Sequence, residues 1–367
     1  MIIDSHAHLH PSQADLDDWD FDGTEDALRH QQRILYIYHR PQAVTESGET
    51  VKDAWKLLWD ERQPNSWAGR TNVNFRIENE RFMWDKDGVT YSAPVRPAAN
   101  AAHLISLMDA VGVDKAVLQA SLPYSRFYGR MMRAYPGRFL PVGILQDDGD
   151  IDTAVAGVHA MVEDGLAGVY QNPIPGWGGF DDYHTPRFDP VWREVERLKL
   201  PVYAMGFVST DHNYTAALPA LKTWMERFPS ISRVLVHGFP PKALLDETGK
   251  FRVTDLMKSV VNDYDTYLEL LPWAMGNYTH DRTDEMVKVV YDTFGPTKFT
   301  WGTEFIKAAP PHTPEHYAEM KGYFETHCPY MSEQDRALIL GGNLARMFGV
   351  ASDAAPAAPE RAAAVAR

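Results

Sequence analysis

Two histidines near the start of the chain have the spacing of a metal-binding pair. His6 and His8 follow a short apolar run in the segment MIIDSHAHLH. Side chains two positions apart on a β-strand point to the same face, about 6–7 Å apart along the strand. Two imidazoles on one face can converge on one divalent metal ion, whereas a chance pair in a loop is the alternative. His10 continues the alternation as a possible third contact, although Pro11 indicates that the strand has ended.

Two later segments place a polar residue directly after an apolar run. The segment VLVHG carries His237, and the segment FTWGTEF carries Glu304. If both runs are strands of a barrel, their side chains emerge at the same rim as the first histidine pair. An imidazole and a carboxylate there could bind metal or act as general acid and base. The alternatives are a core histidine with satisfied hydrogen bonds and a glutamate in an ion pair.

Eight short β-rich runs, with helix-length segments between several of them, predict the framework that positions these residues. This alternation implies an α/β fold with a parallel sheet and helices outside it. Eight strands fit a closed TIM (β/α)8 barrel better than an open sheet. The predicted strands are Ile2–Asp4, Lys115–Gln119, Phe139–Ile144, Ala167–Tyr170, Pro201–Ala204, Arg233–Val236, Tyr267–Leu270 and Lys298–Trp301. The predicted helices include Asn100–Ala110, Asp152–Glu163, Pro190–Leu198 and Tyr214–Phe228.

A large insertion after the first strand, residues 9–100, interrupts the alternation. It is polar and holds five of the ten tryptophans. Asp87-Gly88, between Arg81–Asp85 and Val89–Ser92, predicts a β-hairpin. A loop at this place leaves the barrel on the face that carries the active site, so the insertion is a candidate lid. A structural or subunit-contact segment is the alternative.

Composition narrows the class of protein. The chain has 367 residues, of which 44% are hydrophobic and 23% charged. We expect a single barrel over residues 1–350, followed by a disordered Ala/Pro-rich tail over 351–367. The formal net charge of −14 disfavours nucleic acid and anionic membranes as partners. Cys328 is the single cysteine, so no intrachain disulfide can form. Without a signal-like or membrane-spanning apolar run, we expect a cytoplasmic protein.

Six segments, in this order, resemble the amidohydrolase superfamily. They are IDSHAHLH, LMDAVGVDKAVLQ, YPGRFLPVGIL, VLVHG, WGTEF and GGNLARMFG, and they resemble most the branch with aminocarboxymuconate-semialdehyde decarboxylase and the γ-resorcylate decarboxylases. The resemblance implies that His6 and His8 bind a divalent metal, with zinc expected first and iron or manganese as alternatives. It implies that His237 is a metal ligand or the acid/base. It also places Glu304 where the family has an aspartate that binds metal and water.

Two positions depart from the family pattern. Met205 falls where a fifth-strand histidine is expected, and a thioether is a poor ligand for a hard or borderline divalent ion. Glu304 replaces the aspartate, and its extra methylene moves the carboxylate outward by about 1.5 Å. The substitute donors that the sequence offers are His212, Glu269 and Gln171.

Three functional hypotheses follow from these residues and from the resemblance. The first is metal-dependent hydrolysis or non-oxidative decarboxylation of a small carboxylic acid or amide, with His237 and Glu304 as catalytic residues. The second is an iron- or manganese-dependent oxygenase (hydroxylase) subunit that works with a related barrel subunit. The third is a catalytically impaired structural partner of an active paralogue, which Met205 supports. Either a homo-oligomer or a hetero-oligomer with a related barrel is expected.

Overall fold

The computed structural model describes eleven segments of the chain. They are residues 1–9, 43–51, 74–78, 81–94, 101–120, 125–145, 150–171, 182–205, 214–271, 280–305 and 313–350. The predicted tail, His10, His212 and much of the predicted insertion lie outside these segments. No helix in the described residues is both long enough and apolar enough to span a bilayer.

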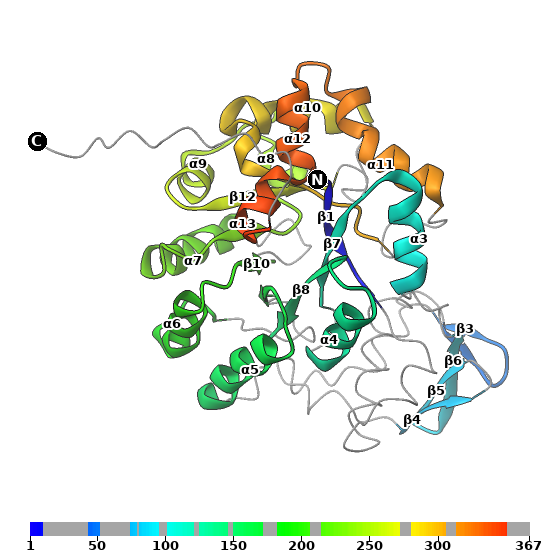
Figure 1. The fold of residues 1–367 in the computed structure, drawn as a ribbon. Helices are drawn as coiled ribbons and strands as arrows, with labels where there is room; N and C mark the ends of the chain where they lie inside the picture. The colour runs from blue at the N-terminus through cyan, green and yellow to red at the C-terminus, as the bar shows by residue number, and fades with distance from the viewer. Residues whose placement is uncertain are drawn as a thin grey trace, which may run out of the picture.

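Eight parallel strands form the nearly closed barrel that the alternating pattern predicts (Figure 1). Their order in the sheet follows the chain, from β1 through β7 to β13. They are β1 (Ile3–Ala7), β7 (Lys115–Gln119), β8 (Phe139–Ile144), β9 (Gly168–Gln171), β10 (Val202–Ala204), β11 (Arg233–Leu235), β12 (Thr266–Leu270) and β13 (Phe299–Trp301). The two edges meet where Ala7 pairs with Phe305, whose backbone N–H donates to the carbonyl of His6 at 3.3 Å.

The largest difference from the predicted strands is at β1, which runs to Ala7 and does not end at Asp4. His6 therefore lies inside the first strand and His8 just beyond it. All five residues of β1 are buried, which is typical of parallel strands covered on both faces. The pairing of β1 with β7 shifts register between Asp4 and Ala7, so the two histidines stand at an irregular end of the strand.

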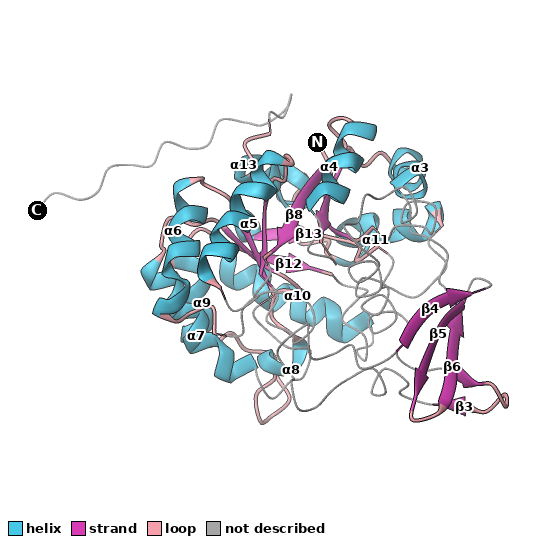
Figure 2. Cartoon of the chain, turned by 90° about the horizontal axis from the view of Figure 1, so that it is seen from below, coloured by secondary structure: helices cyan, strands magenta, loops and turns pink. Residues whose placement is uncertain are grey.

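Helices surround the barrel, as the pattern predicts (Figures 1 and 2). The longer ones are α3 (Ala101–Val111), α4 (Ser125–Ala134), α5 (Ile151–Glu163), α6 (Asp189–Arg197), α7 (Tyr214–Arg227), α9 (Asp255–Asn262), α10 (His280–Phe294) and α11 (Pro314–His327). The shorter ones are α8 (Pro241–Leu244), α12 (Glu333–Ala337) and α13 (Asn343–Met347), with a π-helical turn at Leu338–Gly342 and 3₁₀ turns at Pro186–Phe188 and Pro296–Lys298. The Asp150 side chain caps α5 by accepting the backbone N–H groups of Asp152 and Thr153.

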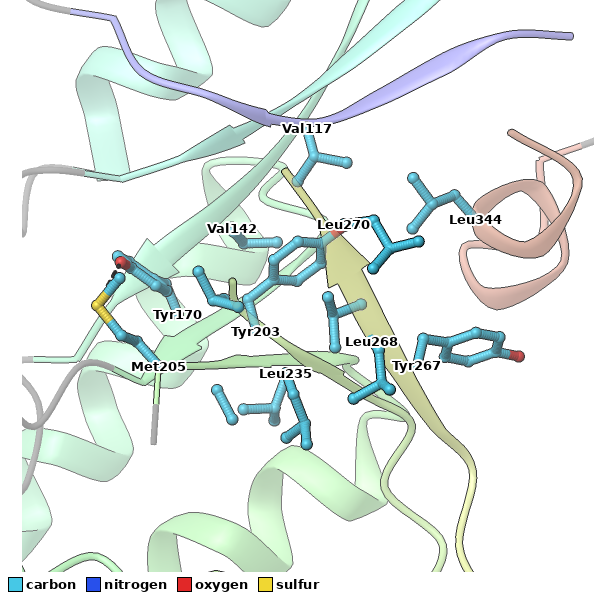
Figure 3. Packing of buried hydrophobic residues seen from close by; sticks show 14 of the residues in the cluster. Val117, Val142, Tyr170, Tyr203, Met205, Leu235, Tyr267, Leu268, Leu270 and Leu344 are labelled. Atoms are coloured by element: carbon cyan, nitrogen blue, oxygen red, sulfur yellow. Dashed lines mark hydrogen bonds between the residues drawn. The ribbon is translucent and has the colours of Figure 1, made fainter. Parts of the chain in front are cut away.

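The core fills the space inside the barrel and the layer between strands and helices. Tyr203 lies in the middle of the barrel, close to Val142 and Leu270 (Figure 3). Trp192 and Trp224 are fully buried and pack against each other with ring centroids 5.0 Å apart. Such dense packing holds the strand ends in fixed positions.

The described part of the insertion is a second, antiparallel sheet. It has five strands in the order β3-β2-β6-β5-β4. They are β2 (Ala43–Thr45), β3 (Thr50–Val51), β4 (Asn74–Glu78), β5 (Arg81–Lys86) and β6 (Val89–Pro94). Asp87 and Gly88 join β5 to β6 with φ of 52° and 76°, the left-handed pair of a tight hairpin turn, so the predicted hairpin is confirmed. The sheet stands to one side of the barrel in both views (Figures 1 and 2), and its role as a lid stays a prediction.

Gly302 allows the last strand to lie against the first one. A Cβ at this position would lie 2.7 Å from the Cβ of His6 and 2.9 Å from the Ser5 Oγ. Both contacts are shorter than side chains tolerate. The Cβ of His6 is attached to the strand backbone, so it cannot move away without distorting the strand. The absence of a side chain at residue 302 is therefore a condition for barrel closure beside the histidine pair.

We expect Gly302→Ala to lower the free energy of unfolding by about 1–3 kcal/mol, because the added methyl overpacks the contact between β13 and β1. Urea unfolding followed by circular dichroism measures this change. The matched control is Gly322→Ala in α11, where a Cβ meets no atom within 4 Å. That substitution should be neutral or raise stability by up to about 1 kcal/mol. Equal stabilities for the two variants would show that the strands are not in the close contact described.

Candidate functional site

The histidine pair lies at the carboxyl end of the first strand, fully buried. The Nε2 atoms of His6 and His8 are 2.9 Å apart, and their ring planes are nearly perpendicular, at 73°. The two rings therefore present their Nε2 atoms to the same small volume, as the spacing along the sequence predicts. Their role as metal ligands stays a prediction.

The partners of the two Nδ1 atoms determine which tautomer each ring adopts. The Nδ1 of His8 lies 2.7 Å from the backbone carbonyl of Gln119, which can only accept a hydrogen bond. The Nδ1 of His6 lies 2.8 Å from the Oε2 of Glu269, and an ionised carboxylate also only accepts. His8 therefore carries a proton on Nδ1 and, when neutral, a lone pair on Nε2, and neutral His6 does the same when Glu269 is ionised.

This arrangement fits a divalent metal ion. Two lone pairs 2.9 Å apart repel each other unless a proton or a metal ion lies between them. Nitrogen ligands at 2.0–2.1 Å from zinc stand about 2.9–3.4 Å apart for angles between 90° and 109°. The observed separation lies at the lower end of that range. Donor atoms of His6, His237 and Glu269 also lie within 4.8 Å of one another, the grouping expected of a possible metal site.

His237 and Glu304 follow β11 and β13, at the same rim as the histidine pair. The ring of His237 stacks on His6 with centroids 5.2 Å apart, and its Nε2 lies 3.6 Å from the Oε1 of Glu304. The structure thus brings together the four predicted site residues. Their side chains differ in exposure, since His237 is 39% exposed and Glu304 11%, whereas both residues of the histidine pair are fully buried. His237 is therefore the member best placed to meet a substrate.

Both residues have a left-handed backbone, with φ of 64° at His237 and 51° at Glu304. Among the described residues, the only other non-glycine positions of this kind are Asp87 and Lys199. A side chain in this conformation costs energy, of order 1 kcal/mol, and such residues gather at functional sites. The turn after each strand therefore holds a predicted site residue at the expense of backbone strain.

Glu269 is the site residue whose role the sequence leaves undetermined. It lies inside the barrel on β12, fully buried, and burial raises its pKa to about 7. Its Oε1 accepts hydrogen bonds from Ser5 Oγ at 2.8 Å and Gln119 Nε2 at 3.0 Å. Its Oε2 accepts the backbone N–H of His237 at 3.0 Å. The sequence signal is an acidic residue within the otherwise mostly apolar run TYLEL, which predicts a buried carboxylate only once the strand is recognised.

Met205 does not take the place of the missing histidine ligand. Its side chain is buried, and the hydroxyl of Tyr170 donates to its sulfur at 3.5 Å (Figure 3). The thioether is thus packed against a tyrosine hydroxyl. Gln171, another proposed substitute, is buried at the end of β9.

A second buried carboxylate ties together the two strands that carry His6 and Glu304. Asp4 accepts hydrogen bonds from the backbone N–H groups of His6 (2.9 Å) and Thr303 (3.0 Å), from Thr303 Oγ1 (2.6 Å), and from the Tyr317 hydroxyl on α11 (2.7 Å). Burial raises its pKa to about 6, against the opposing effect of these hydrogen bonds. Asp4 therefore connects β1, the turn after β13 and the outer helix layer.

The family is established by a comparison with protein-family models. The model described as Amidohydrolase matches residues 3–350, so the chain belongs to the amidohydrolase family. The resemblance drawn from the six sequence segments is confirmed. A comparison with curated proteins found no match.

Solved structures share the barrel at low sequence identity. A 2,6-dihydroxybenzoate decarboxylase in complex with 2,6-dihydroxybenzoate is 16% identical, with a TM-score of 0.50, over 68% of this chain and 88% of that one. A probable 2-pyrone-4,6-dicarboxylic acid hydrolase from Acinetobacter baumannii is 16% identical, with a TM-score of 0.54, over 70% and 91%. An amidohydrolase from Burkholderia multivorans with bound zinc is 15% identical, with a TM-score of 0.53, over 69% and 89%. At these identities the likeness establishes the fold.

We expect Asp4→Asn to lower the free energy of unfolding by about 1–3 kcal/mol, because an amide NH₂ would face groups that all donate. Tyr317→Phe, which removes one of the donors and leaves the carboxylate, should cost about 1 kcal/mol. Chemical denaturation of both variants measures the difference. If Asp4→Asn is no less stable than Tyr317→Phe, the carboxylate does not hold the strands together in the manner described.

Proposed function

We propose that the chain is a metal-dependent enzyme that hydrolyses or non-oxidatively decarboxylates a small carboxylic acid. The observation that carries this proposal is the 2.9 Å separation of the Nε2 atoms of His6 and His8. It is supported by membership of the amidohydrolase family, in which decarboxylases and hydrolases share this barrel.

His6 and His8 would hold the ion, with Glu304 at the rim as the candidate carboxylate ligand. When bound, a divalent ion supplies Lewis acidity toward a carboxylate or water oxygen. Zinc is the metal expected first, because both donors are imidazoles and because the structurally similar amidohydrolase from Burkholderia multivorans contains bound zinc. Iron and manganese suit a site with added carboxylates.

His237 would act as the general acid or base through its Nε2 atom. It is the most exposed of the four site residues, and its Nε2 lies 3.6 Å from the Glu304 carboxylate. A carboxylate at that distance favours the protonated imidazole. In a decarboxylation, the imidazolium would deliver its proton to the carbon that loses CO₂. In a hydrolysis, the neutral ring would take a proton from the attacking water.

The substrate class follows from the likeness to two barrels named for cyclic carboxylic acids. One acts on 2,6-dihydroxybenzoate and the other, a probable hydrolase, on 2-pyrone-4,6-dicarboxylic acid. We therefore infer an aromatic or pyrone carboxylate as the class of substrate. The two reactions differ in whether CO₂ is released.

His6→Ala/His8→Ala should abolish stoichiometric metal binding, whereas His237→Gln should keep the metal and lose about 10²–10⁴-fold in turnover. Elemental analysis of gently purified protein measures the first effect. Release of CO₂ or of a hydrolysed product, from a panel of aromatic and pyrone carboxylates, measures the second. Unchanged metal content in the double variant would remove the basis of the proposal. Loss of metal in His237→Gln would make His237 a ligand.

An iron- or manganese-dependent oxygenase is the second candidate function, favoured by the donor set itself. Two histidines with a nearby glutamate, and Met205 in place of a third histidine, approach the two-histidine, one-carboxylate sets of non-haem iron enzymes. Such a subunit would work with a related barrel subunit.

Protein loaded anaerobically with Fe²⁺ should then consume oxygen in the presence of a reductant and an aromatic carboxylate. The zinc-loaded protein should not, because zinc has no redox chemistry. An oxygen electrode measures the difference, with His6→Ala/His8→Ala as the control for free iron. Equal consumption by this control would exclude an iron centre at the described site.

A further inference from the structure

We propose that Glu269 is the positioning residue of the metal centre. It would fix the tautomer of His6 and the turn that carries His237, and it would place a negative charge behind the imidazole that binds the cation. The proposal rests on the proposed function only in that a divalent ion binds between His6 and His8. Glu269 would touch neither the substrate nor the reacting atoms. It would act through the residues that do.

The first support is that three of the four groups around the Glu269 carboxylate are donors, and the fourth, His6 Nδ1, donates when the carboxylate is ionised. Its Oε1 accepts from Ser5 Oγ and Gln119 Nε2, and its Oε2 accepts from His6 Nδ1 and the His237 backbone N–H. The distances lie between 2.8 and 3.0 Å. A glutamine would have to turn its NH₂ toward one of these two pairs of donors. Among residues of this size, only an ionised carboxylate satisfies all four contacts.

The second support is the electrostatic balance of the buried carboxylate. Within the described part of the chain, no lysine or arginine contacts Glu269. Its neighbours are the rings of His6 and His237, which offset the negative charge only when they are protonated, and a buried anion left unpaired is unfavourable by several kcal/mol. A divalent ion at the Nε2 atoms of His6 and His8 would supply that partner through the imidazole of His6. Carboxylate–histidine–metal arrangements of this kind increase the basicity of the ligand and fix its orientation.

The third support is that the same contacts reach three separate strands. Ser5 and His6 belong to β1, Gln119 ends β7, and His237 follows β11. Gln119 has two roles, because its amide binds Glu269 while its backbone carbonyl holds the Nδ1 of His8. In addition, a Cβ at Gly238 would lie 2.8 Å from the Glu269 carbonyl, so the turn after β11 packs directly on this residue. Glu269 is thus the common acceptor of the groups that orient both histidines and the proposed acid/base.

The test compares Glu269→Gln with Thr266→Val, two isosteric changes on the same strand. Thr266 is fully buried, and its hydroxyl has no hydrogen-bond partner among the described residues. The dissociation constant for Zn²⁺ is measured by chelator competition, and the visible absorption of bound Co²⁺ reports the ligand geometry. We expect Glu269→Gln to bind Zn²⁺ about 10–100-fold more weakly and to change the Co²⁺ spectrum. Thr266→Val should stay within about 2-fold, with an unchanged spectrum.

A second measurement uses the wild-type, metal-free protein and does not depend on the folding of any variant. Nitrogen-15 NMR of histidine-labelled protein, assigned with a His6→Gln sample, reports the tautomer of His6. The proposal requires the proton on Nδ1, and a proton on Nε2 overturns it. Equal Zn²⁺ affinities of wild type and Glu269→Gln also overturn it and leave the metal site intact. Failure of the wild-type protein to bind any metal would instead refute the proposed function.

Discussion

The Nε2 atoms of His6 and His8 face each other at 2.9 Å in a part of the barrel where both rings are fully buried. The backbone carbonyl of Gln119 holds the Nδ1–H of His8, and an ionised Glu269 would hold that of His6. With both Nδ1 atoms protonated in this way, a proton or a metal ion between the two Nε2 atoms makes their short separation favourable.

The barrel supplies the rigidity that this arrangement requires. Three contacts close the barrel between the first and last strands. Ala7 pairs with Phe305, Gly302 leaves room for His6, and Asp4 accepts hydrogen bonds from backbone N–H groups of both segments. The turns that carry His237 and Glu304 have left-handed backbones, and the first of them is held by a hydrogen bond to Glu269. Strain of this kind persists only where surrounding contacts determine the conformation. The site is thus preorganised by contacts between strands far apart in the sequence.

Sequence alone identifies the parts of this arrangement that depend on local pattern. The alternation in DSHAH, the apolar runs before His237 and Glu304, and the order of strands and helices all appear in the barrel. What the pattern could not supply is contact between strands. The role of Glu269 depends on Ser5 and Gln119, which lie 264 and 150 residues away. The predicted first strand ends at Asp4, whereas β1 runs to Ala7, because polar residues continue a strand that is buried on both sides. In the insertion, only the hairpin at Asp87-Gly88 has a turn signal strong enough to recognise.

Met205 changes the chemistry of the centre more than its geometry. In the amidohydrolase pattern a histidine at this position would bring a third nitrogen, but here the residue is a methionine whose sulfur accepts a hydrogen bond from a tyrosine hydroxyl. The remaining donors are two buried imidazoles, with carboxylates around them and a more exposed histidine at the rim. Losing a neutral nitrogen while keeping the carboxylates moves the set toward harder ligands, which weakens the preference for zinc over iron or manganese. Because Glu269 already bonds to four donors, it is poorly placed to turn toward the ion. For the proposed ion, the choice of metal would therefore depend mainly on how closely Glu304, one methylene longer than the aspartate of the family pattern, approaches it.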